Sequence, residues 1–122
     1  MDMADLLDQL RGNKVEKIKL NTRTGYILLH PGEVVYCQAD GNYTEIQMEG
    51  GSRELITQNL SSIEALLGAG SFFRAGRSYL INLKYLVRVE RKSTTCILDH
   101  GGQSTSIKIP AHKIKLLEAS FG

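Results

Sequence analysis

The chain has 122 residues, of which 42% are hydrophobic and 23% charged, and its formal net charge is +2. This length suits one domain with its own hydrophobic core, and this composition excludes a largely disordered protein. No apolar run approaches the length of a membrane-spanning helix, and the acidic start of the chain is unlike a signal peptide. We therefore expect a cytoplasmic domain that does not associate with a membrane.

The charges are unevenly distributed along the chain. Residues 74–92 and 108–115 hold nine Lys or Arg and one acid, a net charge of +8, whereas the remainder has a net charge of −6. Such segregation favours one basic face for a polyanion, although lysines scattered over a solvated surface would give the same count.

Residues 1–13 are predicted to form an acidic amphipathic helix, a leader or linker that precedes a domain of residues 14–122. Its apolar residues recur at the spacing of one helix face, and Gly12-Asn13 would end it. These apolar residues are Met3, Leu6, Leu7 and Leu10.

From residue 15 to residue 109 the chain consists mostly of short apolar segments separated by turn residues. Asp40-Gly41 is a strong hairpin signal because its turn needs a positive φ. In residues 43–48, polar and apolar side chains alternate as in a strand with one buried face, formed by Thr44, Ile46 and Met48. We expect about eight to ten short strands, paired antiparallel because the connections are too short for parallel crossovers.

Two helices interrupt or follow the strands. Ser61-Ser62-Ile63-Glu64 matches a capping box and predicts a short mid-chain helix that ends at Gly68. Pro110 can open a C-terminal helix. The apolar side of that second helix would be lined by Ala111, Ile114, Leu117 and Phe121. The predicted fold is therefore mainly β with two small helices.

Metal, cofactor and catalytic sites are not indicated. Cys37 and Cys96 lack the spacing of a zinc or redox motif and are predicted to be small buried residues. The three histidines lie in unrelated contexts, and no hydrolase, metalloprotease, Walker A or dinucleotide motif occurs. The chain is therefore not expected to be an enzyme.

The most informative segment is Phe73–Asn82, which sets Arg74, Arg77 and Ser78 beside an apolar Tyr-Leu-Ile run. The polar side chains suit a phosphate or a base edge, and the apolar run would anchor them to a core. We expect Asn82 to lock the backbone rather than to touch a ligand.

In order along the chain, four stretches resemble motifs of the LytTR-type DNA-binding domain, the output module of many bacterial response regulators. Residues 33–44 are similar to the family's "dIvyieA.gnYt", residues 59–67 to its "sL..le..L" helix, the Phe73–Asn82 segment to the signature that ends in "HRSylvN", and residues 109–113 to its "ipvsr" ending. The resemblance covers roughly residues 15 to 120. It implies an elongated stack of mostly antiparallel sheets that binds double-stranded DNA with loops, in two successive major grooves and the minor groove between them.

Carried onto this sequence, the resemblance places DNA contacts in three segments: the loop at Asn42 and Tyr43, the segment with Arg74, Arg77 and Ser78, and the start of the last helix at His112 and Lys113, with Lys115 in the same basic stretch. Gly76 stands where the family usually has histidine, which moves the expected recognition onto Arg77.

Five of the candidate residues also have a purely structural interpretation. Arg77 could pair with a surface carboxylate, and Arg74 could hold the loop through an internal ion pair instead of contacting phosphate. Ser78 and Asn42 could serve only as turn residues, and His112 could be a solvated side chain.

The expected ligand is thus double-stranded DNA, with paired direct-repeat half-sites implied by the resemblance. The alternative is a β-rich protein-interaction module whose basic loop engages an acidic protein partner. In either case, the leader helix could link to an upstream receiver domain or serve in self-association.

Overall fold

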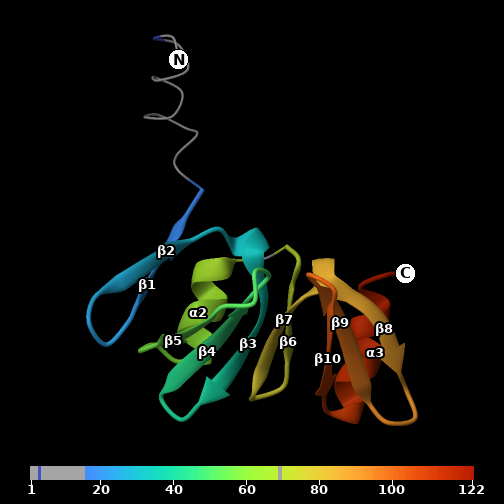
Figure 1. The fold of residues 1–122 in the computed structure, drawn as a ribbon. Coiled ribbons are helices and arrows are strands. Elements are labelled where there is room, and N and C mark those ends of the chain that lie inside the picture. Colours follow the sequence, from blue (N-terminus) through green and yellow to red (C-terminus); the bar gives the residue numbers. More distant parts are fainter. Residues whose placement is uncertain (1–2, 4–15, 69) are drawn as a thin grey trace.

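The computed structural model describes residue 3, residues 16–68 and residues 70–122 (Figure 1). Within them it has ten strands and two α-helices, and every strand pair is antiparallel, which confirms the predicted mainly β fold. Apart from Met3, the leader helix predicted for residues 1–13 lies outside the described residues, so that helix and the boundary at residue 14 stay predictions.

The connections between consecutive elements are short. In chain order they are β1 (Ile18–Asn21), β2 (Tyr26–Leu29), the 3-10 helix η1 (Pro31–Glu33), β3 (Val34–Asp40), β4 (Tyr43–Met48), β5 (Arg53–Ile56), α2 (Leu60–Leu67), β6 (Phe72–Ala75), β7 (Tyr79–Asn82), the 3-10 helix η2 (Leu83–Tyr85), β8 (Leu86–Glu90), β9 (Thr95–His100), β10 (Gln103–Lys108) and α3 (Ala111–Ala119).

The strands form three sheets that succeed one another across the molecule (Figure 1). β1 and β2 form a hairpin, and the central sheet has the order β5-β4-β3-β7-β6. The third sheet has the order β10-β9-β8. In the central sheet β7 lies beside β3, although about forty residues separate them, because β3 pairs with β4 on one edge and with β7 on the other.

Two hydrophobic cores lie on opposite faces of the central sheet. Alternation along each strand sends Cys37 of β3 and Leu80 of β7 into one core, whereas their neighbours Tyr36 and Ile81 enter the other. The β1–β2 hairpin and α2 cover the first core. The three-stranded sheet and α3 cover the second. Each fully buried aliphatic side chain contributes about 1.5–3 kcal/mol, so the central sheet is fixed from both sides.

The mid-chain helix begins earlier than its sequence pattern indicated. The N-cap of α2 is Asn59, whose Oδ1 accepts a 2.8 Å hydrogen bond from the Ser62 N–H. The capping box predicted at Ser61 is therefore wrong, because the helix already begins at Leu60 and Asn59 supplies the cap. The predicted end at Gly68 is confirmed, since this residue caps the helix with a φ of 76°.

Two further expectations need correction. In α3, Ile114 and Leu117 are buried as predicted, but Ala111 is exposed, and Phe121 lies beyond the end of the helix and is 63% exposed. In β4, the predicted buried face is confirmed, but Gln47 on the opposite face is buried as well. The Gln47 side chain is satisfied there because it accepts a 2.7 Å hydrogen bond from Arg53 Nε and donates to backbone carbonyls.

Candidate DNA interface

The β6–β7 hairpin presents Gly76, Arg77 and Ser78 in its turn. The strands behind the turn are anchored, because Leu80 and Ile81 are fully buried in the central sheet. This arrangement confirms the predicted apolar anchor of the basic segment.

Asn82 fixes the far end of β7, as the sequence predicted. It is fully buried, and its Nδ2 donates a 2.9 Å hydrogen bond to the Val34 carbonyl of β3. Its Oδ1 accepts a 3.0 Å hydrogen bond from the Lys84 N–H at the start of η2. The side chain therefore replaces backbone partners at the point where the strand ends.

Gly76 is required by the shape of the turn. Its φ is 85°, in the left-handed region, and a Cβ built on it would lie 3.0 Å from Pro110 Cγ and 3.2 Å from Pro110 Cδ. A larger residue would be strained by the φ and would also displace the proline. Where the family usually has histidine, this turn conformation therefore has no room for a side chain on residue 76.

Arg77 and Ser78 are both exposed. Within the described residues the Arg77 side chain makes no ion pair or hydrogen bond, so no carboxylate there neutralises its charge. The Ser78 carbonyl accepts a 2.8 Å hydrogen bond from the Ala39 N–H, which ties the turn to the end of β3.

Arg74 points back from the turn instead of outward. Its Nη1 lies 2.8 Å from Glu64 Oε1 of α2, and its Nε donates to the Gly76 carbonyl at 2.7 Å. These contacts favour the internal ion pair over the phosphate contact, the two roles that the sequence left open.

The β3–β4 turn lies beside the β6–β7 turn. Asp40 pairs with Tyr43 across the hairpin, so Gly41 and Asn42 form its tip, and Asn42 and Tyr43 are exposed. The hydrogen bond between Ala39 and Ser78 brings the two turns to the same end of the central sheet.

The start of α3 completes this end of the molecule, because Pro110 packs against Gly76. Pro110 is the N-cap residue and provides no side-chain cap, so N–H groups of the first turn remain available to an anion. His112 and Lys115 are exposed, whereas Lys113 is partly buried. The turns β3–β4 and β6–β7 and the start of α3 all lie along the lower edge of Figure 1.

Lys108 joins this site, although the sequence had placed it only in a basic stretch. A pocket of ≈ 470 Å³ is lined by Arg77 and Ser78 on one side and by Lys108, Ile109 and Pro110 on the other. Lys108 lies at the end of a strand in which polar and apolar residues alternate, shortly before Pro110. This position is the signal that could have indicated that Lys108 is exposed beside the turn.

Two residues of the basic stretches, Lys84 and Arg91, do not join the site. Lys84 lies at the opposite end of β7, where its Nζ lies 3.3 Å from the Gly32 carbonyl. Arg91 pairs with Glu118 of α3 at 2.5 Å. Basic residues that are close in sequence are therefore separated in space. Fewer of them lie at the candidate interface than the charge count implied.

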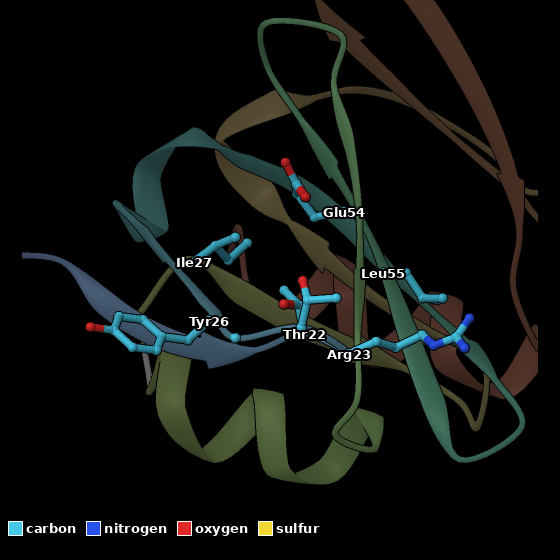
Figure 2. A pocket seen from close by; sticks show the side chains of 8 residues that line it. Thr22, Arg23, Tyr26, Ile27, Glu54 and Leu55 are labelled. Carbon is cyan, nitrogen blue, oxygen red and sulfur yellow. The ribbon is translucent and has the colours of Figure 1, made fainter.

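A second pocket, of ≈ 500 Å³, lies between the β1–β2 turn and β5 (Figure 2). Arg23 and Glu54 line it without forming an ion pair with each other, and it contains none of the predicted contact residues. No group of three or more metal-binding side chains occurs in the described ranges. Cys37 and Cys96 are both buried and unpaired, as predicted, and burial raises the pKa of the Cys37 thiol to about 12.

Comparison with known sequences decides the family. The profile of the LytTr DNA-binding domain matches residues 24–122. The chain belongs to this family. The matched residues therefore form a DNA-binding domain and not a catalytic one. No helix among the described residues is long and apolar enough to cross a membrane.

Two known proteins are similar to the domain. The heme-containing CO-sensing transcriptional regulator RcoM 1 of Paraburkholderia xenovorans (strain LB400) is 27% identical over 108 residues, which cover 87% of this chain and 40% of that protein. The chain thus spans less than half the length of this relative. The solved LytTr DNA-binding domain of a response regulator from Bacillus cereus is 21% identical, with a TM-score of 0.67 over 88% of this chain and 98% of that one. The second likeness supports the fold.

Proposed function

We propose that the domain binds specific double-stranded DNA sequences with three exposed segments at one end of the molecule. The observation that carries this proposal is the pair of contacts that joins them: Ala39 N–H to the Ser78 carbonyl, and Gly76 against Pro110. These contacts gather segments that lie more than thirty residues apart in the sequence. Polar and cationic side chains thereby face solvent together, which is the arrangement that a DNA groove and its two phosphate backbones require.

Within this interface, Arg77 is the proposed base reader. Its guanidinium is exposed on a fixed turn and can fork onto a guanine edge or enter a narrow minor groove. Asn42 at the neighbouring tip can pair with an adenine edge, and Tyr43 would pack beside it.

Phosphate contacts would come from the start of α3 and from the rim of the pocket. The uncapped first turn of α3 offers N–H groups, and His112, Lys113 and Lys115 add charge or donors near it. Ser78 and Lys108 can bind the same backbone from the other side of the pocket. The loops would then occupy adjacent grooves, as the family resemblance implies.

The proposal extends to the arrangement of the site and of the whole regulator. We infer that one domain occupies each of two direct-repeat half-sites in the cytoplasm. We also infer that the domain belongs to a longer regulator with a sensory or receiver domain, because the relative from Paraburkholderia xenovorans is a CO-sensing regulator and the match covers 40% of its length. The leader of residues 1–13 would be the connection.

The test compares two exposed turn arginines that make no ion pair with a described residue. Preferred sites are first selected from a random pool of duplexes, and binding is then measured by fluorescence anisotropy. Arg77→Ala should weaken binding to the selected site by about 1–3 kcal/mol and relax specificity at one base pair. Arg23→Ala, in the β1–β2 turn, should bind as the wild type does.

The outcome that contradicts the proposal is equal binding by the two variants. If no sequence is enriched and the domain instead captures an acidic protein, the protein-interaction alternative replaces it. A recovered pair of repeats would give the half-site spacing at the same time.

A further inference from the structure

Arg74 connects the β6–β7 turn to α2 through its whole guanidinium group. Its Nε donates to the Gly76 carbonyl at 2.7 Å, and its Nη2 lies 3.5 Å from the Arg77 carbonyl. On the other side, its Nη1 donates to Glu64 Oε1 at 2.8 Å and to Ser61 Oγ at 3.3 Å. One side chain thus bonds to two consecutive residues of the turn and to two residues of the helix.

The geometry suits arginine and would not suit lysine. The guanidinium is planar and directs several N–H groups along fixed lines, so it can hold the turn and the helix at once. A lysine ammonium carries the same charge but has no rigid fork. The Arg74 side chain is 25% exposed, and its donors are directed at protein acceptors, which leaves it poorly placed to contact a phosphate.

The turn is held from its other side as well. Pro110, at the start of α3, packs against Gly76. Both contacts therefore fall on Gly76, the residue next to Arg77, which is the proposed base reader. The Arg77 backbone is therefore placed by α2 on one side and by the start of α3 on the other, while its side chain stays exposed.

We propose that Arg74 and Glu64 are positioning residues for DNA binding: they hold the β6–β7 turn in its binding conformation and do not themselves contact DNA. The inference rests on the proposed function of Arg77 and adds α2, a helix with no expected DNA contact, to the binding machinery. A turn fixed before binding loses less conformational entropy in the complex, which raises affinity without a new contact.

The test uses three variants and one matched control on the selected duplex. Arg74→Lys keeps the charge but removes the fork, Arg74→Ala removes both, and Glu64→Gln removes the charge of the helix partner. Glu54→Gln on β5 is the control, because Glu54 makes no ion pair with a described residue and lies in the pocket of Figure 2.

A positioning role predicts that all three variants lose roughly 5- to 30-fold in affinity, while Glu54→Gln does not. It also predicts that the slope of log affinity against log salt stays at the wild-type value, because no phosphate contact is removed. Without DNA, the amides of Gly76 and Arg77 should exchange hydrogen faster in Arg74→Lys and Glu64→Gln than in the wild type. Loss of global stability alone would not give this local change.

Two results would overturn the inference while the proposed function stands. One is wild-type affinity in Glu64→Gln. The other is wild-type affinity in Arg74→Lys together with a salt slope reduced by about one in Arg74→Ala, since that pattern marks a phosphate contact. Absence of DNA binding by the wild type, in contrast, would overturn the proposed function and this inference with it.

Discussion

Gly76 and Pro110 are in such close contact that a Cβ on Gly76 would lie 3.0 Å from the proline Cγ. The two residues are more than thirty positions apart, and their contact joins the β6–β7 turn to the start of α3. The interface proposed for DNA depends on this contact, since it sets the spacing between Arg77 and the first turn of α3.

Gly76→Ala should therefore destabilise the domain and weaken DNA binding together. The positive φ and the displaced proline are expected to cost about 1–3 kcal/mol in the free energy of unfolding, measured by urea denaturation. Gly50→Ala is the control, because Gly50 has no atom within 4 Å of a built Cβ and does not have a positive φ. Equal stability of the two variants would show that the turn can relax away from Pro110.

Replacement by alanine should affect stability at Asn82 and DNA affinity at Asn42. Asn82→Ala leaves the Val34 carbonyl and the Lys84 N–H without their side-chain partner, at a cost of about 2–4 kcal/mol in stability. Asn42→Ala, at an exposed turn, should change stability by less than about 0.5 kcal/mol but should lower affinity for the selected duplex. Thermal denaturation and anisotropy on the same samples check both expectations, and a stable Asn82→Ala would contradict the structural role.

Lys108 and Lys113 should each contribute to the salt dependence of binding. Replacement of either by alanine is expected to weaken binding to specific and random duplexes alike and to reduce the salt slope by about one, as for a single phosphate contact. Lys17→Ala is the control, because Lys17 is exposed and precedes β1. An unchanged slope in Lys108→Ala would remove this residue from the interface.

Stability should fall at alkaline pH because of Cys37. Burial raises the pKa of this thiol from 9.0 to about 12, so above pH 9 the unfolded chain releases a proton that the folded chain retains. The stabilisation is thus fully present below pH 9 and is lost as the pH rises from 9 toward 12, at about 1.4 kcal/mol for each pH unit. Urea denaturation between these values should show a shallower pH slope in Cys37→Ala. Parallel pH slopes in the two proteins would mean that the folded chain does not keep the Cys37 thiol protonated. Burial also raises the pKa of Cys96, Tyr36 and Tyr85, and these groups lower stability at alkaline pH in both proteins.

Local pattern alone predicted much of the fold. The turn at Gly41 and the alternation in residues 43–48, which follow it, are properties of short segments, so they are readable from sequence. The caps were less predictable. Asn59 and Ser61 are both good N-cap residues, and only the folded backbone, in which the Ser62 N–H donates to Asn59 Oδ1, decides between them.

The sequence by itself determined the family, the antiparallel strands and the segments that carry the cationic side chains, because all of these depend on residue type and short-range spacing. Only the tertiary structure decided which cations lie close together. It turns Arg74 inward to Glu64, places Lys84 at the far end of β7 and sets Lys108 beside Arg77. The physical reason is that pairing between distant strands, and packing such as Gly76 against Pro110, fix the direction in which each side chain points, and no local pattern contains that information.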